Sequence, residues 1–147
     1  MSVSLADEVG RIARLELPRG ERAGDAAEAI RAATRHRWVG IYAVDGTEVV
    51  NLAWSGPGPP AHPVFPVSAG LTAEAVSTGA TVVCNDVAGD DRYLEALATT
   101  GSELVVPVLR DGVVVGTLDV ESDRPGAFTT ADAELAERLA QALVGLY

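Results

Sequence analysis

The sequence predicts an α+β fold, in which antiparallel hairpins lie between helices at the two ends of the chain. Two pairs of strand-like segments, within residues 38–54 and 104–120, are each joined by a short turn that contains glycine. Apolar residues recur at helical spacing near the amino end and again over residues 129–147. Paired strands with helices outside them, rather than between them, are typical of the α+β class.

Length, composition and charge limit what the protein can be. We expect its 147 residues to form a single domain spanning 1–147, and the 48% of hydrophobic residues excludes disorder. The net charge of −10, with basic residues dispersed along the chain, argues against nucleic acid and anionic membranes as partners. The chain has no apolar run near the ~20 residues of a membrane span and does not start like a secretory signal. We therefore expect a cytoplasmic protein with no membrane partner.

Two helices are predicted at the amino end. Leu5, Val9 and Ile12 share one helical face, and Pro18-Arg19-Gly20 ends that segment. A second, alanine-rich helix is expected from about Asp25 to Arg35, with Asp25 as its cap.

The first hairpin has strands at Trp38–Val44 and Glu48–Trp54, joined by Asp45-Gly46. Trp38, Gly40 and Tyr42 alternate onto one face of the first strand. Large rings flanking a glycine leave room for a ligand between them. The alternative is that both rings are ordinary core residues whose polar atoms find local partners.

The middle of the chain is expected to cover a pocket. Residues 55–63 hold four prolines and two glycines and read as a stiff loop over the pocket mouth. An extended piece is predicted at Val64–Val67, and a helix that Gly79 ends is predicted at Gly70–Thr78. A strand is expected at Thr81–Cys84, and a short helix or lid at Asp90–Thr99.

The second hairpin carries the main functional signal. Its runs Leu104–Leu109 and Val113–Val120 are apolar on nearly every residue, which indicates that both faces are covered. Glu103, Asp119 and Glu121 nevertheless stand at the end of this hairpin away from its turn. A buried acid is costly unless it is paired or faces a pocket.

The length of the turn decides whether these acids meet. A two-residue turn places Glu103 opposite Val120, so that Glu103 and Asp119 point to opposite faces. A three-residue turn, Arg110-Asp111-Gly112, places Glu103 opposite Asp119, with Glu121 on the same face. We favour the longer turn because aspartate and glycine suit its second and third positions. Three like charges would then require a cationic or hydrogen-donating ligand.

The last helix is predicted to start at Thr129, with Asp132 completing a capping box. It carries one apolar stripe, which covers the sheet, dimerises, or does both: Leu135, Leu139, Leu143 and Leu146. We expect a homodimer through the terminal helices.

No metal site, cofactor or catalytic residue is predicted. His36 and His62 have no second ligand nearby in the sequence, and the single cysteine, Cys84, rules out an intrachain disulfide. Cys84 lacks a nearby histidine or lysine, so we expect a buried, inert thiol.

Five phrases of the sequence, RWVGIY, GLTAEAV, CNDVAGDDRYL, SELVVPV and GTLDVES, resemble a GAF domain over nearly the whole chain. RWVGIY, SELVVPV and LDVES resemble more narrowly the stand-alone proteins around free methionine-(R)-sulfoxide reductase. The resemblance implies an antiparallel six-stranded sheet, with terminal helices on one face and a ligand pocket on the other.

The resemblance also implies a binding set for a small zwitterionic ligand. The residues of this set correspond to Trp38, Tyr42, Glu103, Asp119 and Glu121. The last of them departs from the family, which usually has aspartate where this chain has Glu121. Thr72 and Asp86, which lie in the GLTAEAV and CNDVAGDDRYL phrases, complete the expected set.

The catalytic cysteines of the reductases have no counterpart here. One would stand in the turn at Gly70–Ala73 and the catalytic one near Ala96, and Cys84 matches neither. The sequence therefore predicts a non-catalytic sensor or accessory domain for a cationic or amino-acid-like metabolite. The alternatives are a dimerisation or scaffold module with a vestigial pocket and, third, a reductase-like enzyme that uses Cys84.

Overall fold

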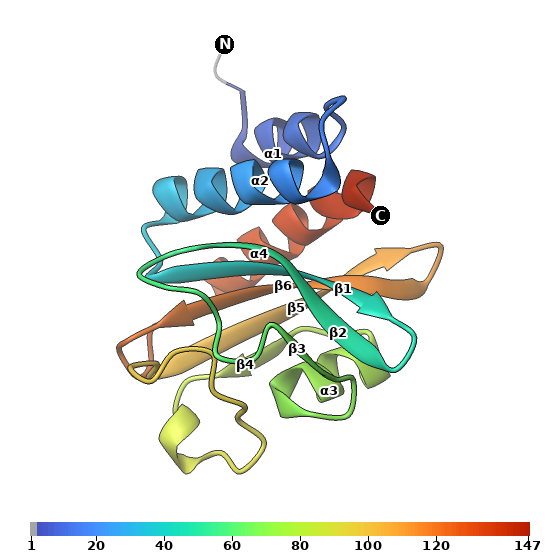
Figure 1. The fold of residues 1–147 in the computed structure, drawn as a ribbon. Helices are drawn as coiled ribbons and strands as arrows, with labels where there is room; N and C mark the ends of the chain where they lie inside the picture. The colour runs from blue at the N-terminus through green and yellow to red at the C-terminus, as the bar shows by residue number, and fades with distance from the viewer. Residues whose placement is uncertain (1–2) are drawn as a thin grey trace.

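The computed structural model describes residues 3–147 as one six-stranded antiparallel sheet with helices on both faces (Figure 1). The strands lie in the order β3-β2-β1-β6-β5-β4. The helices are α1 Leu5–Ala13, α2 Arg19–Thr34, α3 Gly70–Thr78 and α4 Thr130–Ala142. The strands are β1 Trp38–Asp45, β2 Glu48–Ser55, β3 Val64–Pro66, β4 Val82–Cys84, β5 Ser102–Arg110 and β6 Val113–Ser122. Short 3-10 helices occupy Val87–Gly89 and Leu143–Leu146.

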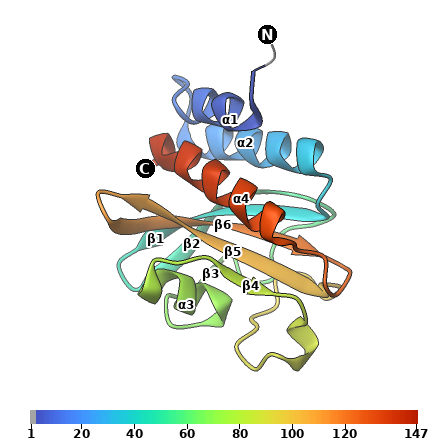
Figure 2. The same cartoon turned by 180° about the vertical axis from the view of Figure 1, so that it is seen from behind.

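The two faces of the sheet are covered differently. Helices α1, α2 and α4 lie on one face, and α3 lies on the other with residues 85–101, which we call the lid segment (Figures 1 and 2). The main apolar core fills the helical face and includes Ile30, Ile41, Leu118 and Leu139. This arrangement confirms the expected fold class. None of the helices described in residues 3–147 is long and apolar enough to cross a membrane.

The second helix starts earlier than the sequence analysis predicts. Helix α2 begins at Arg19, directly after Pro18, and Asp25 is an exposed residue in its interior rather than its cap. Proline is well tolerated at the start of a helix because the first amides have no partner within it. Arg22 links α2 to the end of α1 and to the last 3-10 helix, because its Nη1 donates to the carbonyl oxygens of Ala13 and Gly145.

Helix α4 starts as expected and uses its apolar stripe within the chain. Thr129 and Asp132 form the predicted capping box, with the Thr129 amide donating to Asp132 Oδ2 at 2.8 Å. Leu139, Leu143 and Leu146 are almost fully buried in the main core. The stripe therefore covers the sheet, and these three leucines are not free to form a dimer interface.

The turn of the β5–β6 hairpin differs from the favoured prediction. Arg110 pairs with Val113, so the turn has two residues, and Asp111 and Gly112 have φ of 52° and 78°. Two positive φ values are typical of a type I′ turn. The predicted three-residue turn is wrong.

A β-bulge brings the acids onto one face instead. The register shifts between Val108 and Leu109, because Val108 pairs with Gly116 while Leu109 pairs with Val114. This extra residue in β6 changes which side chains share a face. Glu103 consequently pairs with Glu121, and Asp119 pairs with Val105 on the same face.

The lid segment contains no α-helix, contrary to one of the two predictions for Asp90–Thr99. Its only helical turn is the 3-10 piece Val87–Gly89, before the expected position. The Ala61 amide, in the proline-rich loop 55–63, donates to the carbonyl oxygen of Ala96 at 2.9 Å. The loop and the lid segment are therefore joined to each other.

The bulge leaves no room for a side chain at Gly116. A Cβ atom there would overlap the carbonyl oxygen of Tyr42 and the ring of Tyr147, whose hydroxyl donates to that oxygen at 2.7 Å. We expect Gly116→Ala to lower the free energy of unfolding by about 1–3 kcal/mol, as measured by urea denaturation. Gly20→Ala, in an uncrowded position of α2, is the control and should be neutral or slightly stabilising. Equal stability of the two variants would contradict this account of the bulge.

Candidate functional site

Three carboxyl groups meet on the face of the sheet opposite the terminal helices. Glu103 comes from β5, and Asp119 and Glu121 come from β6. One oxygen from each lies within 4.8 Å of one from each of the others. We call this cluster the acid triad. The prediction that these three acids share one face is thus confirmed, although the bulge rather than a longer turn is responsible.

The triad is buried and only partly hydrogen-bonded. Glu103, Asp119 and Glu121 are 4%, 5% and 1% exposed. Thr100, in the lid segment, donates from Oγ1 to Glu121 Oε1 at 2.6 Å, and the Tyr93 hydroxyl lies 3.4 Å from the same atom. Among the residues described, Asp119 Oδ1 and Glu121 Oε2 have no partner. Buried polar atoms are nearly always hydrogen-bonded in proteins, so these two oxygens are suited to accept hydrogen bonds from a ligand or water.

The burial of like charges changes the acidity of the triad. Burial, with Asp119 and Glu121 nearby, raises the pKa of Glu103 well above its usual range. Burial raises the pKa of Asp119 to about 6. Burial and the neighbouring Asp119 raise the pKa of Glu121 to about 9. At neutral pH the triad by itself therefore retains protons, and a bound cation would replace them.

Two kinds of cation suit this arrangement. An ammonium group offers three donors to carboxylate oxygens through short, charge-assisted hydrogen bonds. A hard divalent cation prefers oxygen ligands, but calcium takes six to eight of them, and the triad supplies three carboxylates. Organic ammonium is thus the better match to the number of side chains present.

The tryptophan does not flank an open space as the sequence analysis predicted. A Cβ atom on Gly40 would overlap the six-membered ring of Trp38, so the indole itself covers this glycine. Trp38 is fully buried, and its Nε1 donates to the carbonyl oxygen of Gly58 at 2.9 Å. Trp38 thus behaves as a core residue that holds the proline-rich loop.

Tyr42 and Thr72 do reach a cavity beside the triad. This cavity has a volume of about 20 Å³ and is lined by Tyr42, Thr72, Ala96, Glu103 and Asp119, among others. Its outer wall contains His62 from the proline-rich loop, Phe65 from β3, and Leu94 and Glu95 from the lid segment. The volume is enough for about one water molecule. Any larger ligand requires the loop or the lid segment to move.

Asp86 lies apart from the residues expected to act with it. It is exposed, and its Oδ2 would lie 3.1 Å from a Cβ atom on Gly89, within its own turn. It does not line the cavity.

Sequence reasoning missed Thr100 and Tyr93, which bind the triad from the lid segment, because no local pattern connects them to β6. It also missed the unpartnered Thr117, which the period-two alternation from Asp119 could have identified.

Cys84 faces the same side of the sheet as Glu103, with which it pairs across β4 and β5. It packs in an apolar cluster with Leu71, Val87 and Val105 and does not line the cavity. The thiol donates to Asp90 Oδ2 at 3.4 Å, and burial raises its pKa. The expectation of a buried thiol is confirmed.

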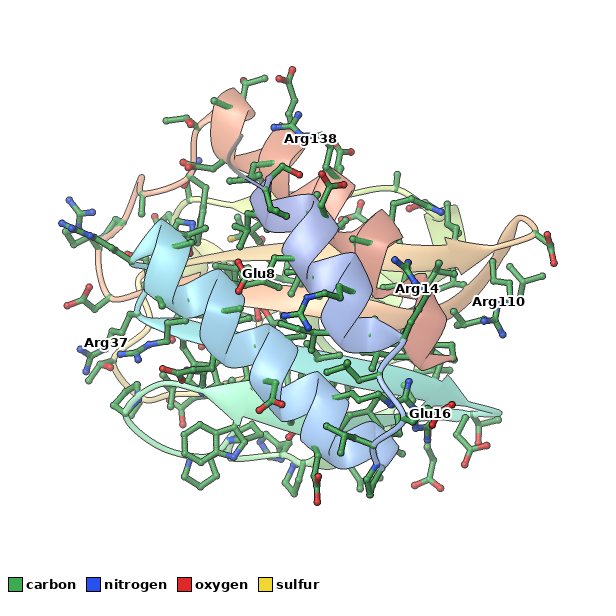
Figure 3. The ribbon with its side chains drawn as sticks, turned by 90° about the horizontal axis from the view of Figure 1, so that it is seen from above. Glu8, Arg14, Glu16, Arg37, Arg110 and Arg138 are labelled. Atoms are coloured by element: carbon green, nitrogen blue, oxygen red, sulfur yellow. The ribbon has the colours of Figure 1, made fainter. Side chains whose placement is uncertain are left out.

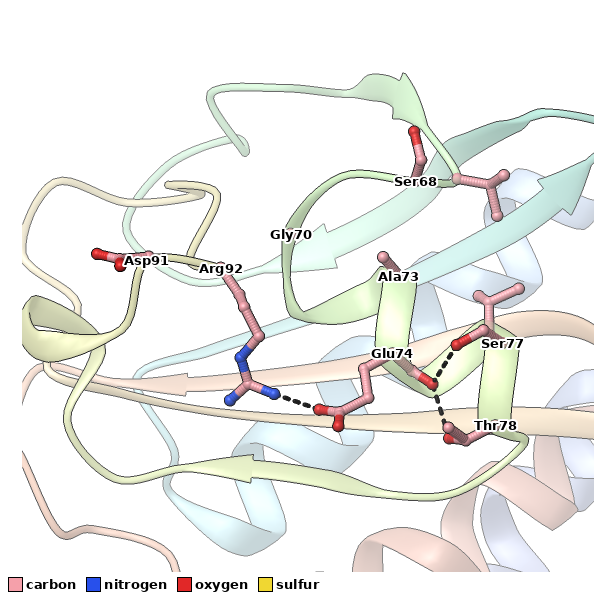
Figure 4. Close-up of a pocket in the computed structure, with 10 residues that line it drawn as sticks. Ser68, Gly70, Ala73, Glu74, Ser77, Thr78, Asp91 and Arg92 are labelled. Atoms are coloured by element: carbon pink, nitrogen blue, oxygen red, sulfur yellow. Dashed lines mark hydrogen bonds and ion pairs between the residues drawn. The ribbon is translucent and has the colours of Figure 1, made fainter.

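A larger groove opens between α3 and the lid segment (Figure 4). Glu74 and Arg92 face each other across it and form an ion pair, and Arg92 also binds Asp90 at 2.6 Å. Hydrogen bonds from Arg92 hold the pKa of Asp90 below its usual range. Glu74 and Arg92 in this groove are thus paired with each other, and none of the residues predicted to bind a ligand lines it.

Comparison with known proteins identifies the family. A family model for the GAF domain matches residues 20–144. The chain belongs to the GAF domain family. Two relatives match over 106 residues, 72% of this chain: GAF domain-containing protein A of Dictyostelium discoideum at 28% identity, and Protein YtsP of Bacillus subtilis at 30%. The match spans 66% and 65% of the length of these relatives, respectively.

Solved structures similar to this GAF domain include enzymes as well as sensors. A type II free methionine-R-sulfoxide reductase from Thermoplasma acidophilum is 26% identical, with a TM-score of 0.81 over 94% of both chains. The free methionine-R-sulfoxide reductase of Neisseria meningitidis, in complex with its substrate, has the same identity and TM-score over 99% of this chain and 95% of its own. A putative GAF sensor protein from Burkholderia vietnamiensis is 27% identical, with a TM-score of 0.83 over 95% of this chain and 89% of its own.

The acid triad should make the stability of this GAF domain depend on pH. Because the pKa of Asp119 is raised to about 6 and that of Glu121 to about 9, the folded state binds more protons than the unfolded state above pH 4. Stability should therefore fall as the pH rises through this range, up to the folded pKa values. We expect the thermal unfolding temperature to drop from pH 6 to pH 9, and Glu121→Gln to flatten that drop. Glu16→Gln, at an exposed acid, should leave the slope unchanged. A flat profile for the unmodified protein would refute the protonation of the triad.

Proposed function

We propose that this GAF domain binds a small, amino-acid-like molecule through its ammonium group, as a sensor or accessory domain without catalysis of its own. The observation that carries the proposal is the acid triad, three buried carboxyl groups with two oxygens that lack a partner among the described residues. An ammonium group would neutralise the triad and satisfy those oxygens together.

The surroundings of the triad support a ligand of mixed character. Tyr42 lines the cavity and packs edge-on against Phe65, with ring centres 5.7 Å apart. Such rings suit a short apolar or thioether side chain. The similarity to the Neisseria meningitidis reductase, solved with its substrate, favours a ligand related to methionine sulfoxide.

The closed cavity implies that binding and lid movement are coupled. Thr100 and Tyr93 hold the lid segment to Glu121, which is one of the groups that the ligand would use. A ligand larger than a water molecule would have to expand a space of about 20 Å³ whose lining includes Ala96 of the lid segment. The lid segment thus offers a route by which occupancy could be signalled to a partner.

The thiol chemistry supports binding rather than catalysis. A thiolate nucleophile needs a lowered pKa and access to the bound substrate. Cys84 has a raised pKa and packs among apolar side chains outside the cavity. The position where the resemblance expects the catalytic cysteine, near Ala96, does line the cavity but carries no thiol.

A thermal-shift screen of free amino acids and methionine derivatives tests the proposal. At a concentration of 100 times its Kd, a true ligand should stabilise the folded state by about 2.7 kcal/mol. The shift should disappear in Glu103→Gln and Asp119→Asn and persist in the exposed control Glu16→Gln. Screening the same panel as desamino analogues isolates the role of the ammonium group.

Two results would overturn the ammonium assignment. Either the desamino analogues bind as well as the amino compounds, or a divalent cation alone produces the triad-dependent shift. Thiol-dependent turnover of free methionine sulfoxide that is lost in Cys84→Ser would overturn the non-catalytic assignment.

The small size of the cavity favours a second candidate function, a scaffold module whose pocket is vestigial. Such a module would act through self-association. The apolar stripe of α4 is buried, so a dimer through the terminal helices would have to use other, exposed surfaces of these helices. This function predicts a stable dimer in light scattering and no ligand-induced shift. Leu139→Glu is unsuitable as a test of that dimer, because it would put a charge in the main core.

A further inference from the structure

A groove at the end of α2 brings an arginine from after β6 together with three arginines that are neighbours in the sequence. Arg31 lies in the last turn of α2, Arg35 and Arg37 lie between α2 and β1, and Arg124 follows β6. Together with other residues, including His36, they line a groove of about 540 Å³. Figure 3 shows Arg37 beyond the end of α2, well separated from Arg14, Arg110 and Arg138. Arg124 therefore joins the other three arginines in space, although it lies far from them in the sequence.

These four guanidinium groups are available for a ligand. In residues 3–147, the only side-chain ion pairs are those of Arg92 with Asp90 and Glu74. The Nε of Arg31 donates to the carbonyl oxygen of Arg37 at 3.1 Å, a contact that does not neutralise its charge. Four arginines thus share one groove with no carboxylate in salt-bridge contact.

The local charge contrasts with that of the whole chain. The groove carries four arginines and two acids, Asp123 and Asp132, so its formal charge is 4 − 2 = +2. With a net charge of −10 for the chain, the other residues carry −10 − 2 = −12. The net negative charge of the remaining residues disfavours a long polyanion that extends beyond the groove, whereas a small anion would contact only the groove.

The frame that holds these arginines is rigid. The buried Ser102 donates from Oγ to the carbonyl oxygen of Arg124 at 2.6 Å, and the Arg124 amide donates to Ser122 Oγ at 3.2 Å. Across the groove, the ring of His36 packs against Phe128, with ring centres 5.3 Å apart. The backbone positions of Arg124 and of the residues around His36 are therefore set before any ligand arrives.

We propose that this groove binds a small molecule bearing a phosphate group. Guanidinium groups bind phosphate oxygens in a bidentate manner and stay charged at all physiological pH values. A volume of about 540 Å³ is typical of sites for small molecules. The groove shares no lining residue with the cavity beside the acid triad, so the two sites would take ligands of opposite charge.

Calorimetric titration with pyrophosphate at low ionic strength tests this site. The double variant Arg37→Gln, Arg124→Gln removes two exposed guanidinium groups from the groove. The double variant Arg11→Gln, Arg138→Gln is the matched control, because it removes the same charge from exposed arginines outside the groove. We expect millimolar or tighter binding, weakened about tenfold or more in the groove variant and nearly unchanged in the control.

Four results would overturn the proposal: no binding of pyrophosphate, equal weakening in both double variants, equal binding of sulfate and pyrophosphate, or tighter binding of a short single-stranded DNA. The last result would assign the groove to a polyanion instead. Glu103→Gln, which disables the proposed ammonium site, should leave pyrophosphate binding intact. Failure of one site is therefore distinguishable from failure of the other.

Discussion

The burial of three like-charged groups on one face of the central hairpin is the constraint on which the rest of this GAF domain depends. Glu103, Asp119 and Glu121 can remain together in a water-poor space only if protons or a cation offset their repulsion. The lid segment supplies part of the hydrogen bonding through Thr100, and within residues 3–147 two carboxyl oxygens of the triad have no partner. Both oxygens belong to the candidate ligand site.

The main apolar core lies on one face of the sheet, and the candidate functional site lies on the other. On the helical face, a continuous apolar cluster joins α1, α2 and α4 to the sheet, and Arg22 and Tyr147 add hydrogen bonds to backbone carbonyls. The opposite face holds two smaller apolar clusters, one around Leu71 and Cys84 and the other around Trp38 and Tyr42. Most of the apolar burial therefore lies away from the triad, which allows a buried polar site to persist in this domain.

Families that share this fold differ in what they place around the pocket. The similar solved structures include two named as reductases and one named as a sensor, at nearly equal identity to this chain. Function in such a family is decided by individual side chains rather than by the fold. In this chain, Glu103, Asp119 and the alanine at position 96 line the cavity, and the function proposed above depends on them.

The sequence by itself determined the class of fold, most element positions, the capping box at Thr129 and the identity of the acids, because these depend on local spacing and residue type. It also predicted that the three acids share a face, but through a turn that does not form. Only the tertiary structure decided the bulge near Val115, the position of the Trp38 ring over Gly40, the small volume of the closed cavity and the meeting of Arg37 with Arg124. Each of these depends on contacts between segments far apart in the chain, and no short-range pattern records such contacts.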